Sequence, residues 1–260
     1  MKEDWRIIWS AASEADLRQW KAMIEGTLTP PEPAPSLEHI LCRAIFSKDM
    51  DLIQTCLSRG AKLDDWVHES VGRNLSLALL QVLVPAGLNV NYNADRLGGY
   101  LTTAIYRGDL GLVRYLLRQG ANPNQDPKID RFPALTVAIQ KNDVEMAEML
   151  IQHGAWVNGF GALGMAAKYR RFEMMDLLIE HGADVNDNAK DLPWTSILTP
   201  QERLTALHEA ALEGNKDVVA YLLERGANRN LQNVSGETPL TLAQTNGHRD
   251  VVELLQRGRV

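Results

Sequence analysis

His208 and Glu209 are the residues whose types and spacing come closest to a recognised chemistry. They open the run His208-Glu209-Ala-Ala-Leu212, which begins like the zinc-protease motif His-Glu-x-x-His. Two histidines four residues apart on one helix would hold a zinc ion. Leu212 stands where the second histidine is required. One imidazole without a partner at helical spacing predicts no metal site.

Other chemistries find little support in the residue types. The chain contains neither a Gly-x-Ser-x-Gly nucleophile motif nor a phosphate-binding Gly-x-x-x-x-Gly-Lys motif. Cys42 and Cys56 are its two cysteines, too few for a cysteine-rich zinc cluster. We expect both to be buried reduced thiols, and a disulfide or a reactive thiol is the alternative. The sequence therefore predicts no catalytic residue, no metal, no cofactor, and a protein that is not an enzyme.

Two short helices, expected over 205–214 and 217–227, form the unit that positions these residues. Leucine, valine and alanine recur along them at helical spacing, and Gly214 and Gly226 end them. A helix pair of this size cannot bury its apolar faces alone, so it needs neighbouring copies. Copies with the same ending lie at Gly60, Gly120, Gly154, Gly182 and Gly226, with weaker ones at Gly26, Gly87 and Gly258. Their mean spacing of about 33 residues is typical of a stacked repeat array.

The repeated motifs resemble those of the ankyrin repeat family. Thr205-Ala-Leu-His-Glu-Ala stands where the family has Thr-Pro-Leu-His-x-Ala, and Glu237-Thr-Pro-Leu-Thr-Leu-Ala243 is a second near match. The endings Gly-Ala-x-x-Asn at 120–124, 154–158, 182–186 and 226–230 are similar to the family's repeat ending. The resemblance implies an all-α fold, an ankyrin-type helical repeat solenoid with short finger turns and about eight repeats, several of them degenerate. It also implies that His208 orders its turn through backbone hydrogen bonds.

We expect residues 1–260 to form a single array of such repeats. Residues 1–28 would be a degenerate N-terminal capping repeat and 29–36 a proline-rich connector. The segments expected after them are irregular repeats at 37–97, regular repeats at 98–186, an inserted finger loop at 187–201 and C-terminal repeats at 202–260. The insertion lengthens one spacing to 44 residues, whereas a spacing of 28 before Gly182 predicts a shortened finger turn. Apolar residues of the insertion, Trp194 among them, either fold back on the array or bind a partner.

Charge and hydropathy limit the kinds of partner. The net charge of −6 argues against non-specific binding to nucleic acid or to an anionic membrane. No targeting signal is visible near the N-terminus, and the longest apolar run, 75–88, is interrupted and shorter than the roughly 20 residues of a membrane span. We therefore expect no nucleic acid partner, no membrane partner, and an intracellular protein, cytoplasmic or nuclear. The oligomeric state does not follow from the sequence.

In ankyrin-like stacks the first helices and the finger turns line a concave groove, and the resemblance assigns one set of side chains to it. That set comprises Tyr106, Arg107, Phe132, Lys141, Phe160, Lys168 and Tyr169, joined by Trp194 of the inserted loop. Exposed aromatic and arginine side chains are favoured as interface anchors, and a basic rim speeds the encounter with an acidic partner. We expect these residues to bind a protein or peptide that is acidic and has an apolar anchor. The alternative is that they are scattered solvated surface.

The sequence favours a non-catalytic protein–protein interaction module, a scaffold or adaptor that binds a partner segment in its concave groove. The alternative is an enzyme or a small-molecule-binding protein whose pocket is formed by the groove and the 187–201 loop. Missing motifs do not exclude this alternative, because an active site can be assembled from scattered residues. Its titratable candidates would be Tyr106, Lys168, Tyr169 and Glu213, converging in a closed pocket.

Overall fold

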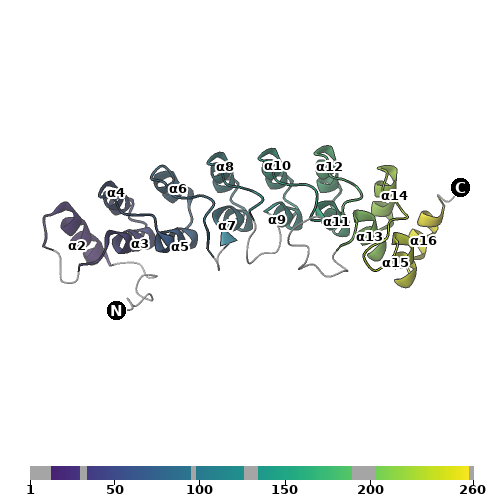
Figure 1. The fold of residues 1–260 in the computed structure, drawn as a ribbon, viewed down its shortest axis with the longest axis horizontal. Coiled ribbons are helices and arrows are strands. Elements are labelled where there is room, and N and C mark those ends of the chain that lie inside the picture. Colours follow the sequence, from purple (N-terminus) through teal and green to yellow (C-terminus); the bar gives the residue numbers. More distant parts are fainter. Residues whose placement is uncertain (1–12, 30–33, 95–97, 126–133, 189–202, 258–260) are drawn as a thin grey trace. The chain divides into compact units, whose positions relative to one another are not determined.

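The protein folds into paired helices, most of them eight to eleven residues long. A computed structural model describes residues 13–29, 34–94, 98–125, 134–188 and 203–257 (Figure 1). Fifteen helices and one pair of two-residue strands lie within these ranges. The chain divides into two compact units, unit 1 with Met1–Ala121 and Pro127–Ile129, and unit 2 with Asn122–Asp126 and Asp130–Val260. The expected single array and its segment boundaries stay a prediction.

The described residues of unit 1 form one single helix and three helix pairs. The single helix is α2 (Glu14–Glu25), and Arg43 of the next helix lies over the ring of its Trp20, 5.6 Å from the centroid. The pairs are α3 (Leu37–Ser47) with α4 (Met50–Ser58), α5 (Asp65–Arg73) with α6 (Leu77–Leu83), and α7 (Tyr100–Arg107) with α8 (Leu110–Arg118). A short antiparallel pairing of β1 (Asn93–Ala94) with β2 (Gly98–Gly99) precedes α7.

Unit 2 contains four helix pairs. They are α9 (Ala134–Lys141) with α10 (Val144–Gln152), α11 (Ala162–Lys168) with α12 (Phe172–Glu180), α13 (Ala206–Leu212) with α14 (Lys216–Glu224), and α15 (Pro239–Thr245) with α16 (Arg249–Gln256). We call the first helix of each pair, in either unit, an inner helix and the second an outer helix. The inner helices of unit 2 contact one another in chain order, so the pairs stack (Figure 1). This confirms the predicted all-α fold of repeated helix pairs.

Local signals in the sequence explain where the helices begin. Three outer helices, α4, α8 and α10, start after an aspartate, because Asp49, Asp109 and Asp143 each accept a hydrogen bond of 3.0 Å from the backbone N–H three residues later. Inner helices α13 and α15 start instead at threonine capping boxes, Thr205 with His208 and Thr238 with Thr241. Capping by these side chains satisfies backbone donors that the first helical turn leaves unpaired.

Asparagines at the repeat endings join successive repeats. In unit 1, the amide of Asn91 donates to the carbonyl oxygen of Gly120 at 3.0 Å. In unit 2, Asn124 and Asn158 donate to the carbonyls of Gly154 and Gly182 at 2.7 and 2.9 Å. The asparagine that ends one repeat therefore has a structural role, because its side chain forms a hydrogen bond with the glycine turn of the next repeat.

The repeats on either side of the expected insertion are also joined to each other. The backbone N–H of Asn228 donates to Oδ1 of Asn186 at 2.8 Å. On the outer helices, the Tyr221 hydroxyl and the Arg225 guanidinium of α14 both donate to Oδ1 of Asp176 on α12 at 2.6 Å. Inner helices α11 and α13 contact each other as well. The extra residues between Asn186 and Asn228 therefore leave the stacking of these two repeats intact.

Both cysteines lie in the core of unit 1, as predicted. Cys42 and Cys56 are free and buried, and desolvation raises their thiol pKa values to about 11 and about 12. We expect neither thiol to react with Ellman's reagent in the native protein at pH 8, because the reactive thiolate is scarce and shielded. Both should react in urea. Rapid labelling of the native protein, or a disulfide found by mass spectrometry, would contradict this expectation.

Candidate functional site

The side chains predicted to bind a partner are divided between the two units. Tyr106 and Arg107 belong to unit 1, whereas Lys141, Phe160, Lys168 and Tyr169 belong to unit 2. Phe132 and Trp194 lie outside the described residues. Their proposed role in binding stays a prediction, and each unit offers its own candidate surface.

In unit 1 the last turn of α7 presents both predicted residues. The Tyr106 side chain is 47% exposed. Arg107 is exposed too, but its Nη1 donates a hydrogen bond of 2.8 Å to the carbonyl oxygen of Leu75, between α5 and α6. Arg107 therefore ties its repeat to the preceding one, and this structural role accompanies any role in binding.

In unit 2 the aromatic residues differ sharply in exposure. Tyr169, at the end of α11, is 49% exposed, and Lys141, at the end of α9, is exposed as well. Phe160 is only 5% exposed, so the expectation that it offers a surface anchor is wrong. The connection from α10 to α11 has only nine residues, 153–161, against fourteen, 225–238, between α14 and α15. This shortened turn, which the spacing predicted, draws Phe160 into the core.

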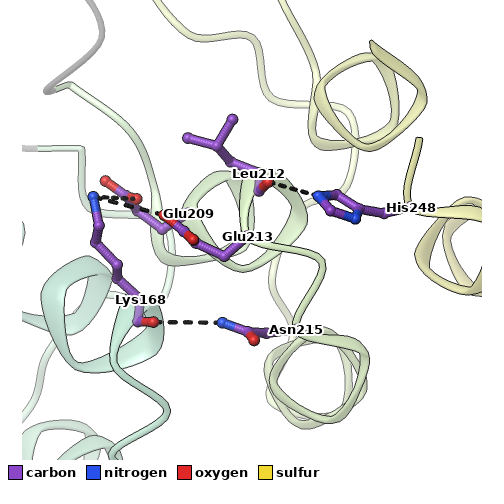
Figure 2. A network of polar contacts seen from close by, with 6 residues as sticks. All are labelled: Lys168, Glu209, Leu212, Glu213, Asn215 and His248. Atoms are coloured by element: carbon purple, nitrogen blue, oxygen red, sulfur yellow. Dashed lines mark hydrogen bonds and ion pairs between the residues drawn. The ribbon is translucent and has the colours of Figure 1, made fainter. Parts of the chain in front are cut away.

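A network of charged side chains joins α11 to α13 (Figure 2). The ammonium Nζ of Lys168 lies 3.8 Å from Oε2 of Glu209 and 3.8 Å from Oε1 of Glu213. We call Lys168, Tyr169, Glu209 and Glu213 the inner-helix patch. The two carboxylates outnumber the ammonium group, so the positive character expected at Lys168 is offset within the patch itself.

Glu209 is the least solvated member of the inner-helix patch. Its side chain is 15% exposed, and its buried Oε2 has no hydrogen-bond partner. Desolvation raises the pKa of this carboxyl group, while the nearby Lys168 acts in the opposite direction. In this environment the negative charge of Glu209 lowers the stability of the folded protein, because a buried polar atom without a hydrogen-bond partner is unfavourable.

His208 has the structural role that the resemblance implied. Its ring is fully buried, and Nε2 lies 3.1 Å from the carbonyl oxygen of Glu237 in the next repeat. A carbonyl can only accept, so Nε2 carries the proton and Nδ1 accepts from the Thr205 hydroxyl at 2.7 Å. Burial lowers the pKa of His208, which keeps the ring neutral. The residue that began the sequence search is therefore a link between repeats.

The run Gly159-Phe-Gly161-Ala-Leu-Gly164 matches the dinucleotide fingerprint Gly-x-Gly-x-x-Gly in its letters but not in its context. The fingerprint binds a pyrophosphate between a strand and the helix that follows it. Here helix α10 precedes the glycines. The backbone N–H groups of Gly159 and Gly161 donate to Oδ2 of Asp187 at 2.9 and 3.4 Å. These donors are used within the protein, so the match carries no nucleotide site.

One pocket of unit 2 lies at the turn between α13 and α14. Its volume is about 520 Å³, and it is lined by Arg170, Gly214, Asn215, Lys216, Asp217, Ala220 and Leu254. Arg170 and Asp217 form an ion pair across it. Among the titratable candidates for an enzyme, Lys168, Tyr169 and Glu213 are absent from this lining. The pocket expected under the 187–201 loop falls almost entirely outside the described residues.

In the described part of the chain, no three histidine, cysteine, aspartate or glutamate side chains are grouped so that they could hold a metal ion. None of its helices is both long and apolar enough to cross a membrane.

Sequence reasoning overlooked Glu209 as a surface residue. It entered only through the incomplete zinc motif, whereas Glu213 was named among the titratable candidates for an enzyme. The signal that could have found it lies 45 residues earlier, where Gly164 replaces the motif histidine of its repeat. A β-carbon at Gly164 would lie 3.7 Å from Cγ of Glu209, so Glu209 lies directly against this glycine of the neighbouring repeat.

Comparisons with known proteins agree with the architecture. The family model described as "Ankyrin repeats (3 copies)" matches residues 101–189 and 193–259. Human "Cyclin-dependent kinase inhibitor 2A" is 28% identical over 171 residues, which cover 66% of this chain and 81% of the relative. "Cyclin-dependent kinase 4 inhibitor B" of Rattus norvegicus is 27% identical over 155 residues, 60% of this chain and 88% of the relative.

Some similar proteins are much longer than the region that matches. "Dynein axonemal heavy chain 12" of Bos taurus is 36% identical over 90 residues, 31% of this chain. The chain spans only 24% of the length of that relative. This similarity therefore covers a small part of both proteins.

Proposed function

Because the chain belongs to the ankyrin repeat family, we propose that it is a non-catalytic interaction module that binds a segment of a partner protein on its inner helices. Ankyrin repeats are generally protein–protein interaction modules, which supports this assignment. Two of the relatives are named as inhibitors of cyclin-dependent kinases, which are themselves proteins. An intracellular location, cytoplasmic or nuclear, is part of the same proposal.

The observation that carries the proposal is the exposure of Tyr169 at the end of an inner helix. Its ring is 49% exposed, whereas the large apolar side chains of α11 and α13 are buried (Leu163 and Leu207) or half-buried (Met165 and Leu212). Tyrosine combines a large apolar face with a hydroxyl group, and it is enriched among residues that dominate binding energy. Tyr106 has a similar exposure in unit 1. We propose that each ring packs against an apolar anchor of the partner.

The two lysines of unit 2 in the predicted set differ in how strongly they favour an acidic partner. Lys141 at the end of α9 is exposed, and its positive charge favours a partner carboxylate at that helix. Around Lys168 on α11, Glu209 and Glu213 make the net charge negative, which favours an anion less. We therefore propose that acidic residues of the partner lie toward α9, beside the apolar anchor that contacts Tyr169.

Loss of the tyrosine rings should weaken binding of peptides selected for affinity to the full chain. Peptides would be enriched from a random peptide library displayed on phage and measured by fluorescence anisotropy. Tyr169→Ala, Tyr106→Ala and Trp194→Ala are each expected to lower the affinity of the peptides that use their surface by about tenfold or more, because truncating an aromatic anchor removes at least ~1.4 kcal/mol.

Matched controls are available in both units. Trp66 and Trp156 are exposed to almost the same degree as the two tyrosines, but they lie outside the predicted set. Trp66→Ala and Trp156→Ala should leave the affinity within about twofold, as expected for residues outside the energetic centre of an interface. Equal losses in tyrosine variants and controls, or undiminished binding in all three predicted variants, would end the assignment of this surface.

A further inference from the structure

The patch around Glu209 has an acceptor that the protein does not satisfy. Lys168 is the nearest cation, but its Nζ lies 3.8 Å from Oε2 of Glu209, beyond hydrogen-bonding distance. The same ammonium group lies equally far from Oε1 of Glu213. One lysine is therefore shared by two carboxylates and makes a hydrogen bond to neither.

The position of Glu209 follows from the neighbouring repeat. Gly164 on α11 carries no side chain, and Glu209 of α13 extends across it toward Lys168. Leu204 and Ala206 also approach Gly164, with backbone atoms 3.6 and 3.8 Å from where its β-carbon would be. The Glu209 side chain therefore lies against Gly164 of α11, and its carboxylate lies beside Lys168 (Figure 2).

The charges of the patch leave an excess of one negative charge. Glu209 and Glu213 contribute two, and Lys168 compensates for one. Partial burial makes the Glu209 charge unfavourable for folding, since its pKa is raised mainly by desolvation. A neutral side chain of the same shape would suit the fold better. Residues that lower stability in this way are found more often at functional sites than elsewhere.

We infer that Glu209 and Glu213 bind a positively charged side chain, an arginine or a lysine, from the partner segment whose apolar anchor packs on Tyr169. This inference rests on the proposed function, because it adds a second contact to the same surface. Tyr169 directly follows Lys168, the last residue of α11, and Glu209 of α13 and Glu213 at its C-terminal end both lie 3.8 Å from the Lys168 ammonium group. The proposed segment crosses the ends of both helices and contacts all four residues.

Arginine suits the two carboxylates best. Its planar guanidinium group offers five donors, which can address two carboxylate groups together. Lys168 is 42% exposed, so its long side chain can move aside as the partner's cation enters. The partner would then have opposite charges along its length, with acidic residues toward Lys141 on α9 and a basic residue toward α13.

The test uses the full chain and peptides from the random library displayed on phage. Peptides whose binding depends on Tyr169 are expected to be enriched in arginine or lysine at one position. Glu209→Gln should lower the affinity for these peptides by about tenfold or more, because a hydrogen bond between charged groups is lost. Replacing the basic residue of the peptide with glutamine should cause a similar loss in the wild-type protein and little further loss in Glu209→Gln.

A second measurement separates binding from folding. Glu209→Gln should raise the urea midpoint of unfolding at pH 7, so weaker binding by a more stable protein cannot be an effect of misfolding. Glu173→Gln removes an exposed charge from the first turn of outer helix α12 and serves as the control. Its peptide affinities should stay within about twofold of the wild-type values, as expected when a remote surface charge is screened.

The possible results distinguish this inference from the function on which it rests. If peptides depend on Tyr169 but bind Glu209→Gln as well as the wild type, the cationic contact is wrong and the interaction surface stands. Enrichment of acidic residues opposite Glu209 would also overturn the inference. If no selected peptide depends on Tyr169, the proposed function fails at this surface, and the inference fails with it.

Discussion

Replacing Gly214 with alanine is expected to lower the free energy of unfolding of unit 2 by about 2–4 kcal/mol. Gly214 follows α13 with a φ of 71°, a left-handed conformation that costs an alanine about 1 kcal/mol. An added β-carbon would also lie 2.5 Å from Nδ1 and 2.8 Å from Cγ of His248. The imidazole would have to leave its place, where Nε2 donates to the carbonyl oxygen of Leu212 at 2.9 Å (Figure 2). Urea unfolding followed by circular dichroism measures the change.

Gly247→Ala provides the matched control for this variant. Gly247 stands at the same place in the following repeat and has a φ of 76°, but no atom lies within 4 Å of its added β-carbon. Its substitution should lower the free energy of unfolding by only about 1 kcal/mol, the contribution of the left-handed backbone conformation. The difference between the two variants therefore measures the contact with His248. Equal losses would show that the imidazole moves aside freely, contrary to the expected result.

Lowering the pH from 7.5 to 5.5 is expected to reduce the stability of the protein by about 1–3 kcal/mol. Burial lowers the pKa values of His68 and His208 below the ordinary value of 6.5. The folded chain then binds these protons less tightly than the unfolded chain. The stability they contribute is fully present above about pH 6.5 and is lost as the pH falls below it, by up to about 1.4 kcal/mol per pH unit for each ring.

Neighbouring charges modify this pH dependence without reversing it. Asp64 and Asp65 raise the pKa of His68, and Glu237 raises that of His208, but desolvation is the largest effect at both rings. Glu209 acts in the opposite sense, because its raised pKa means that acid removes an unfavourable charge from the folded state. This effect offsets part of the loss of stability as the pH approaches the pKa of the Glu209 carboxyl group.

The contribution of His208 can be isolated with two variants. His208→Gln should reduce the slope of stability against pH, although it also lowers stability at pH 7.5 because the bridge to the carbonyl of Glu237 changes. His181→Gln replaces an exposed histidine in the turn after α12 and serves as the control for the loss of an imidazole. A wild-type protein whose stability is constant down to pH 5.5 would contradict the assignment of neutral, buried rings.

Much of the fold follows from local signals that the sequence carries repeatedly. Gly-Ala endings place the repeat boundaries, and aspartate or threonine caps place many of the helix starts. The short spacing before Gly182 predicted the short turn that the structure contains. These signals are reliable for two reasons. They recur in successive repeats, and the residues that contact each other within a helix pair are close in sequence.

The surface is harder to predict, because it depends on contacts between repeats. Phe160 occupies a turn position that a longer finger would expose, but the nine-residue connection leaves it buried. Lys168 looks like a free cation in its own repeat, and only the stacking of α13 on α11 brings two glutamates to it. Glu209 also lies against Gly164 of the neighbouring repeat, where an added β-carbon would be 3.7 Å from its Cγ. None of these pairings has a signature within a single repeat.

The bridge between Asn186 and Asn228 has a consequence for how this protein can diversify. Because side chains and helix contacts hold the two repeats together, the register of the stack does not depend on how many residues lie between them. Segments of different length and composition can then be exchanged at this point during evolution, or grafted there by design, while the neighbouring helices keep their places. The junction thus allows new specificity to be acquired with little penalty to folding.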